Sequence, residues 1–234
     1  YPGAVSSNVS YITRFNDKVV FSATGNEENG QELWISDGTE EGTYMLMDIN
    51  ILGGSNPQGF VQVNEHQFIF SAIDLESTVY GESEQHWLYV SDGTEEGTRM
   101  IMDCDVKYPG TNVNNDKTHF VRVGRKVFFK ADTKDGDYTE ALWITDGTPE
   151  GTKMLKDINT TIADETTGAT ASSRIDWLTN FENKKAFFTA YSPEYGQEPW
   201  VSDGTPEGTY MVKDCQEGLD NNGLPRGSGA FTPV

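Results

Sequence analysis

Four aspartates recur at equivalent places in four similar segments of the chain, at Asp48, Asp103, Asp157 and Asp214. Carboxylate oxygens are preferred ligands of Ca²⁺ in proteins, so these side chains are candidate metal ligands. Their alternative role is to accept hydrogen bonds from the linker that follows each segment. Both roles stay open at this point, and calcium is the only cofactor that the sequence predicts.

Acidic and aromatic side chains are interleaved in the segments that vary most between the four repeats, and these segments hold a single base, Lys134. Carboxylates accept hydrogen bonds from sugar hydroxyls, aromatic rings stack on apolar sugar faces, and both suit calcium or a basic protein. Loops on a rigid scaffold carry function more often than the scaffold does. The predicted ligand-binding residues are Tyr80, Glu82, Glu84, Trp87, Asp135, Asp137, Tyr138 and Tyr195.

Enzyme motifs are missing from the sequence. It contains no G-x-S-x-G, no H-E-x-x-H and no P-loop. His66, His86 and His119 lack the spacing of metal ligands. We therefore predict a protein that is not an enzyme: a lectin-like binding or adhesion module whose partner is a glycan or a basic protein. The alternative is a structural, storage or matrix protein that self-associates without a specific small ligand.

The pattern W/Y-I/V-S/T-D-G-T-x-E-G-T defines the repeat. Its Asp-Gly pairs begin at Asp37, Asp92, Asp146 and Asp203, so the repeat length is about 55 residues. An aspartate before glycine at a hairpin tip typically bonds the backbone N–H groups that follow it. We expect this structural role for the four carboxylates, with calcium binding as the alternative.

Each repeat contains four apolar runs, which are rich in β-branched and aromatic residues and are bounded by turn residues. Such runs predict β-strands, and an antiparallel four-stranded sheet must bury its faces against a neighbour. The predicted fold is all-β: a β-propeller with four blades of four antiparallel strands. A single repeat domain is expected over 1–234, with repeats at 8–50, 57–105, 118–159 and 175–216.

Two features predict that the chain is a doubled half with a pseudo-two-fold axis. The turn between the first and second strands is one residue shorter in repeats 1 and 3 than in repeats 2 and 4. Cys104 and Cys215 occur only in repeats 2 and 4, where repeats 1 and 3 have isoleucine. Buried free thiols are the favoured state of these cysteines, and a disulfide is the alternative.

The tail at 217–234 contains a fifth segment, Gly229 to Val234, that is similar to a first strand. Three roles are open for this segment: it is redundant, it adds a strand to another blade, or it pairs with a neighbouring molecule. The last possibility predicts a homo-oligomer formed through terminal strands. The chain being a piece of a longer array is a further alternative.

Glu32 to Thr39 read E-L-W-I-S-D-G-T and resemble the ELWxxDGT tandem repeat of large secreted or surface bacterial proteins. Repeats 2 and 3 depart from this motif, with Trp87 and Ala141 in place of the glutamate, and Pro199 replaces the leucine in repeat 4. The resemblance covers nearly the whole chain. It implies propeller-like folding and an extracellular setting, and it implies neither an enzymatic activity nor a particular ligand.

The composition is strongly acidic, with a formal net charge of −20. Such a charge repels nucleic acid and anionic membranes, and no apolar run is long enough to cross a bilayer. We therefore expect no nucleic-acid partner and no membrane insertion. The start at Tyr1 and the N-x-S/T sequons at Asn8 and Asn159 favour a secreted glycoprotein.

Overall fold

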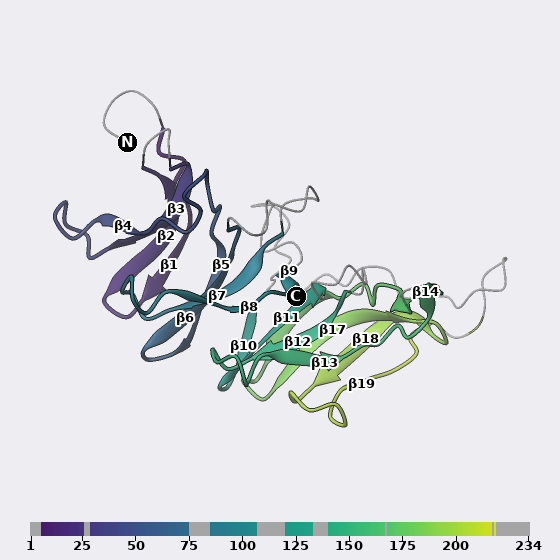
Figure 1. Ribbon diagram of the computed structural model, residues 1–234. Helices are drawn as coiled ribbons and strands as arrows, with labels where there is room; N and C mark the ends of the chain where they lie inside the picture. The colour runs from purple at the N-terminus through teal and green to yellow at the C-terminus, as the bar shows by residue number, and fades with distance from the viewer. Residues whose placement is uncertain are drawn as a thin grey trace. The chain divides into compact units, whose positions relative to one another are not determined.

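The computed structural model describes residues 6–25, 29–74, 85–106, 120–132, 140–166, 168–216 and 218 (Figure 1). Every regular element among them is a β-strand. No helix in this described part of the chain is long and apolar enough to cross a membrane. The all-β prediction is therefore confirmed.

Four antiparallel sheets contain most of the strands, and the strand order within each follows the chain. The first sheet has β1 (Ser10–Phe15), β2 (Lys18–Thr24), β3 (Gln31–Ser36) and β4 (Tyr44–Met47), and the second has β5 (Gln58–Asn64), β6 (Gln67–Ala72), β7 (Trp87–Ser91) and β8 (Arg99–Met102). The third has β10 (Val121–Val123), β11 (Lys126–Asp132), β12 (Ala141–Thr145) and β13 (Lys153–Lys156), and the fourth has β16 (Asp176–Phe181), β17 (Lys185–Ser192), β18 (Gly196–Ser202) and β19 (Tyr210–Met211). Three short strands complete the set: β9 (Asp105–Val106), β14 (Ile162–Asp164) and β15 (Ala169–Thr170). The four repeats are thus confirmed as four sheets, and their closure into a ring stays a prediction.

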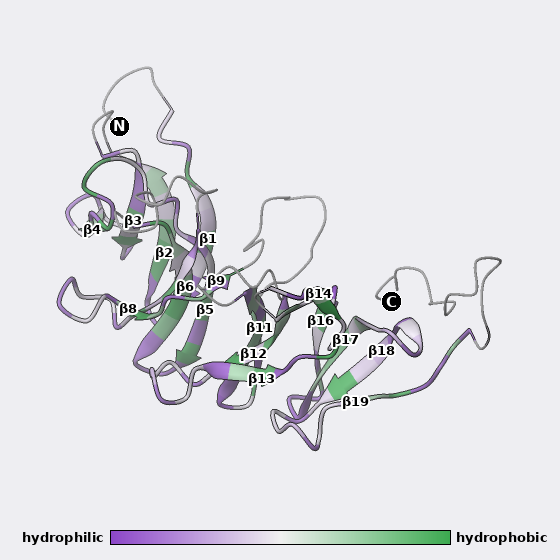
Figure 2. Ribbon diagram, turned by 45° about the vertical axis from the view of Figure 1, so that its right-hand side comes forward, coloured by the Kyte–Doolittle hydropathy of each residue, from purple (hydrophilic) through white to green (hydrophobic). Residues whose placement is uncertain are grey.

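Side chains alternate between the two faces of each sheet, as they must in extended strands. The apolar colouring in Figure 2 accordingly lies on the strands, and the turns between them are mostly hydrophilic. We call forward the face of the first sheet that carries Val20, Leu33, Ile35 and Leu46, and rear the face that carries Val19, Phe21 and Trp34. Strand register identifies the equivalent faces of the other sheets.

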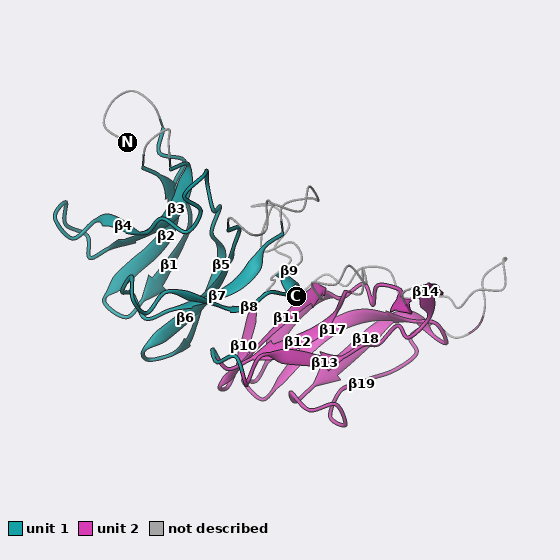
Figure 3. Cartoon of the chain, viewed as in Figure 1, with its two compact units in different colours: residues 1–109, 147–149 teal, residues 110–146, 150–234 magenta. Residues whose placement is uncertain are grey.

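The chain divides into two compact units, coloured separately in Figure 3. Unit 1 comprises residues 1–109 and 147–149, and unit 2 comprises 110–146 and 150–234. The main boundary falls close to the middle of the chain, where the sequence predicted that a half is duplicated. Each unit contains one odd-numbered and one even-numbered repeat.

In unit 1, the forward face of the first sheet packs on the rear face of the second. Phe68 and Phe70 of β6 belong to this core together with Leu33 and Ile35 of β3. The ring of Phe68 meets that of Phe15 edge-on, with centroids 4.8 Å apart. An aromatic ring buries roughly 150–250 Å², so each one contributes several kcal/mol at about 25 cal/mol per Å².

Unit 2 repeats the same packing with its own residues. The forward face of the third sheet, with Phe128 and Leu155, packs on the rear face of the fourth, with Phe188 and Trp200. Trp200 is 8% exposed and the equivalent Trp143 of the third sheet is 6% exposed. Both tryptophans are buried, whereas the equivalent Trp34 of the first sheet is partly exposed. The packing within the two units is the same, as a duplicated half predicts.

The hairpins between third and fourth strands are closed by their own repeat residues. Asp37 Oδ1 accepts hydrogen bonds from the Thr39 backbone N–H at 2.9 Å and from the Thr39 hydroxyl at 2.7 Å. These bonds hold the pKa of Asp37 below its usual range. Asp92 and Asp203 bond the threonine two residues later in the same way. The carboxylates therefore have the structural role that the sequence predicted.

Gly97→Ala is expected to destabilise unit 1 by about 1–3 kcal/mol, because a Cβ at this position overlaps the carboxylate of Asp92. The hairpin would have to open to relieve that overlap. Gly53→Ala is the matched control, since a Cβ there meets nothing within 4 Å. Urea unfolding of both variants measures the difference, and equal stabilities would contradict this account of the hairpin.

Both cysteines are free thiols, so the alternative of a disulfide is wrong. Cys104 is buried, as predicted, whereas Cys215 is exposed. The prediction for Cys215 fails because the last strand of the fourth sheet, β19, ends at Met211. In the second sheet the equivalent strand β8 has four residues and precedes a buried cysteine.

Candidate functional site

Three of the acidic and aromatic side chains come together beside the turn between β17 and β18. Tyr195 lies in this turn next to the exposed Glu194. A hydrogen bond to Glu194 raises the pKa of the Tyr195 hydroxyl, and the negative charges of Glu194 and Asp214 raise it further. Glu194 is thus hydrogen-bonded to the partly exposed phenol, and the charge of Asp214 acts on the same group. Such a surface suits sugar hydroxyls or a cation.

A positively charged side chain packs on an aromatic residue of β17. The guanidinium of Arg174 lies over the ring of Tyr191, 5.3 Å from its centroid, which is a favourable cation–π distance. Gln197 donates from Nε2 to the backbone carbonyl of Arg174 at 3.0 Å. The segment just before β16 is therefore tied to β17 and β18.

Trp87 corrects the predicted ligand-binding set. Its side chain is 1% exposed and belongs to the core of unit 1, so its ring is not available to stack on a sugar. Position 87 is the first residue of β7, on the rear face that packs against the first sheet. Tyr195 is the one predicted ligand-binding residue placed at the surface, and the others lie outside the described residues: Tyr80, Glu82, Glu84, Asp135, Asp137 and Tyr138.

The four candidate metal ligands lie on four different sheets and bond nearby groups. Asp48 accepts a hydrogen bond from the amide of Asn29. Asp157 accepts one from the Thr170 hydroxyl at 2.8 Å, and Asp214 one from the Gln216 N–H at 3.1 Å. Among the described residues, which include Asp103, no three His, Cys, Asp or Glu side chains gather as a metal site. Calcium binding stays a prediction.

Asn159, in one of the two sequons, is 4% exposed. Its side-chain amide donates to the backbone carbonyl of Ser172 at 2.9 Å. The nitrogen that would carry a glycan is therefore engaged inside the folded chain.

Glu32 is a buried carboxylate whose role the sequence did not reveal. It is 0% exposed and accepts three hydrogen bonds: from the Ser55 N–H at 2.7 Å, the Ser55 hydroxyl at 2.5 Å and the Ile49 N–H at 2.9 Å. Desolvation is the main reason that the pKa of Glu32 is raised to about 7, and the charge of Asp48 adds to it. Glu32 thereby fixes the linker between the first and second sheets.

Unit 2 has a buried ionic group at the equivalent junction. Lys130 is 7% exposed, and its Nζ lies 3.4 Å from Glu140 Oε2 and 3.4 Å from Asp176 Oδ1. Glu140 also accepts the Ile175 N–H at 2.7 Å. Because the other three repeats have Ser22, Ser71 or Thr189 at the position of Lys130, comparing the repeats could have marked this lysine.

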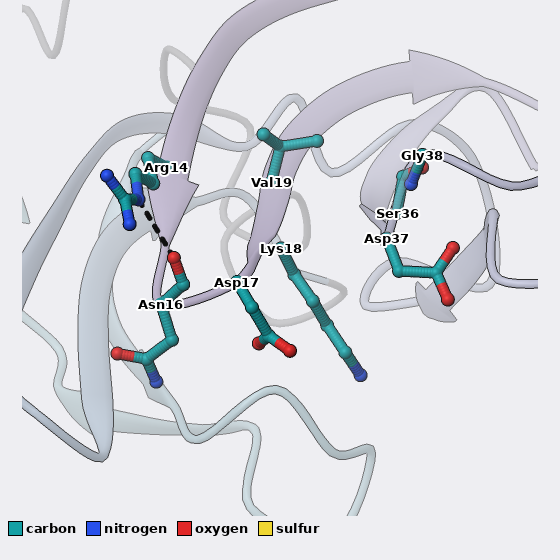
Figure 4. Close-up of a pocket in the computed structure, with 8 residues that line it drawn as sticks. All are labelled: Arg14, Asn16, Asp17, Lys18, Val19, Ser36, Asp37 and Gly38. Carbon is teal, nitrogen blue, oxygen red and sulfur yellow. Dashed lines mark hydrogen bonds between the residues drawn. The ribbon is translucent and has the colours of Figure 1, made fainter.

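An open pocket of about 370 Å³ lies at the end of the first sheet (Figure 4). Side chains of both signs line it: Arg14 and Lys18 are basic, and Asp17 and Asp37 are acidic. Arg14 Nε donates to the backbone carbonyl of Asn16 at 2.8 Å. The pocket is formed by the turn between β1 and β2 and by the hairpin after β3. A mixed charge of this kind suits a small ligand that carries both donors and acceptors.

No protein-family model matches the chain, and no curated protein matches it significantly. Among solved structures, a puromycin hydrolase is similar over 88% of this chain and 29% of its own, with 15% identity and a TM-score of 0.52. A mutant puromycin hydrolase complexed with PGG covers 84% and 27%, with 14% identity and a TM-score of 0.50. A prolyl endopeptidase structure covers 83% and 24%, with 10% identity and a TM-score of 0.45. The chain thus spans less than a third of the structures that it matches.

The fold of the chain is thus similar to part of the puromycin hydrolase structure, and its distant structural neighbours are propeller-containing peptidases. These comparisons also correct one prediction. We expected a protein that is not an enzyme, whereas this all-β fold occurs within a hydrolase. At 15% identity the likeness concerns the fold alone. It names no catalytic residue in this chain.

Proposed function

We propose that the chain is a propeller-type repeat domain that binds a ligand rich in hydroxyl groups, or a cation, through the loops between the second and third strands of its sheets. The observation that carries the proposal is the cluster of Tyr195, Glu194 and Asp214. Supporting it, the hairpin aspartates are already engaged with their own threonines. The acidic and aromatic residues that differ between the repeats lie in the loops between the second and third strands. A calcium-assisted, lectin-like mode and an extracellular setting remain parts of this proposal.

Tyr195→Ala and Asp214→Asn are expected to weaken binding about tenfold each, because they remove a stacking ring and a charged acceptor. The measurements are a glycan array and a calcium titration followed by melting temperature. Tyr210→Ala is the matched control, since Tyr210 is 47% exposed and lies on β19 under Lys185. Unchanged binding in both loop variants, or equal losses in the control, would refute the proposed site.

The likeness to puromycin hydrolase supports a second candidate function. In that case the chain is the repeat domain of a larger hydrolytic protein, of which it spans a part, as it spans 29% of the matched structure. The test is to incubate the full protein with puromycin and follow the products by mass spectrometry. Hydrolysis would support this function, and a KM raised by Tyr195→Ala at unchanged kcat would assign substrate binding to the loops.

A further inference from the structure

Three of the four described first strands, β1, β5 and β16, are preceded by a serine in an equivalent position. An alanine recurs near the end of the second strand in each repeat, and the backbone N–H of the residue after it donates to the carbonyl of this serine. The bonds are Thr24 to Ser7 at 2.8 Å, Ile73 to Ser55 at 2.8 Å and Tyr191 to Ser173 at 2.7 Å. The residue after each serine is left-handed: Asn8 with φ 47°, Asn56 with φ 46° and Arg174 with φ 47°. A serine followed by a left-handed residue therefore marks the beginning of a first strand.

Glu32 shows what such a serine does at a junction between sheets. Its carboxylate accepts both the N–H and the hydroxyl of Ser55 and also the N–H of Ile49. Ser55 is 0% exposed. The glutamate of one sheet thus receives the serine that begins the next sheet.

Glu198 is the equivalent glutamate of the fourth sheet, and it is only half satisfied. Its Oε2 accepts the Cys215 N–H at 2.9 Å, just as Glu32 accepts the Ile49 N–H. Glu198 is 0% exposed, and its buried Oε1 accepts no backbone N–H or hydroxyl among the described residues. The Cys215 thiol also bonds this carboxylate, but a thiol is a weak donor. An unmet buried acceptor costs about 1–3 kcal/mol, so this oxygen points to a missing donor.

The forward face of the fourth sheet is also less covered than its equivalents. Val212 is 49% exposed, whereas the corresponding Leu46 and Leu155 are each 5% exposed. In both units, the following first strand supplies an apolar residue to this core: Phe60 is 5% exposed and Leu178 is 2% exposed. The fourth sheet thus lacks both the serine and the apolar side chain of a following strand.

The tail contains a serine followed by a residue that readily becomes left-handed. Ser228 is followed by Gly229, and glycine adopts left-handed backbone readily. The distance in sequence from Cys215 to Ser228 lies between those from Ile49 to Ser55 and from Ile158 to Ser173. The tail is covalently tethered to the same unit, which gives it a high effective concentration at this surface.

We propose that residues 228–234 bind the forward face of the fourth sheet as the first strand of a following repeat, with the Ser228 N–H and hydroxyl donating to Glu198. The fourth sheet then receives a following first strand, as the first sheet receives β5 and the third receives β16. This inference does not depend on the proposed ligand-binding function.

A double-mutant cycle in the full chain tests the proposal. Ser228→Ala should raise the unfolding equilibrium constant of unit 2 about fivefold, and it should have no effect in a Glu198→Ala background. Thr232→Ala, from the same segment, is the control and should have the same effect in both backgrounds. Additive effects of Ser228→Ala and Glu198→Ala would overturn the proposal.

Hydrogen exchange of the unmodified chain gives a second readout that does not require the variants to fold. The Ser228 amide should exchange slowly at all protein concentrations. Rapid exchange would overturn the proposal. Two other results would also overturn it. Coupling between Glu198→Ala and Ser7→Ala would assign the site to the N-terminal strand. Protection that appears only at high protein concentration would assign it to a second copy of the chain.

Discussion

Replacing Lys130 with alanine is expected to destabilise unit 2 by about 3–5 kcal/mol, because removing one partner of a buried ion pair leaves uncompensated charge. Lys130 Nζ lies 3.4 Å from carboxylate oxygens of both Glu140 and Asp176, and it donates to the backbone carbonyl of Ile175 at 3.0 Å. The variant would lose all three contacts. Urea unfolding, followed by hydrogen exchange of peptides from unit 2, measures the loss.

Lys184→Ala is the control for this prediction. The pair of Lys184 with Glu182 has a similar separation of 3.4 Å, but its side chains are 76% and 64% exposed. An exposed pair contributes between zero and about 1 kcal/mol. If Lys130→Ala cost no more than Lys184→Ala, the ionic group would not be what fixes the linker before the fourth sheet.

The strands could be predicted from the sequence because each one repeats a local pattern. The run from Val19 to Ala23 is mostly apolar, contains β-branched residues and is bounded by turn residues, and it lies within β2, which extends one residue further at each end. The recurrence of Asp-Gly fixed the hairpins for the same reason, since an aspartate and the threonine two residues later need no distant partner. Strands and hairpins that depend only on neighbouring residues can therefore be predicted from the sequence of a single repeat.

The contents of the candidate site were harder to predict, because burial depends on the neighbouring sheet. Trp87 follows a variable acidic segment in the sequence. In the structure its side chain is buried on the face of the second sheet that packs on the first sheet. In the sequence, Glu32 is one of several acidic residues in a charged loop. In the structure it is fully buried and bonded to Ser55. Aligning the linkers on the strand that follows them would have shown the recurrent serines at Ser7, Ser55 and Ser173.

The buried state of Glu32 has a consequence for the pH dependence of unit 1. Its pKa in the folded chain is about 7, above the ordinary value of 4.5. The folded state therefore binds a proton more tightly than the unfolded state, and the associated stability is fully present below pH 4.5 and is lost as the pH rises through 7. We expect the free energy of unfolding of unit 1 to fall by about 2 kcal/mol between pH 5.5 and 8.

Glu32→Gln should abolish this slope, because glutamine does not titrate. It should also lower stability at pH 6 by about 1–3 kcal/mol, because an amide nitrogen replaces one of the two oxygens and leaves either the Ser55 N–H or the Ile49 N–H without an acceptor. Asp37 and Asp92 have lowered pKa values, so their stabilising contributions are lost only as the pH falls through acidic values, well outside this window. Glu40→Gln, at an exposed position, is the control and should keep the slope. If the free energy of unfolding of Glu32→Gln still fell between pH 5.5 and 8, another group would carry the pH dependence. The raised pKa of Glu32 would then not explain it.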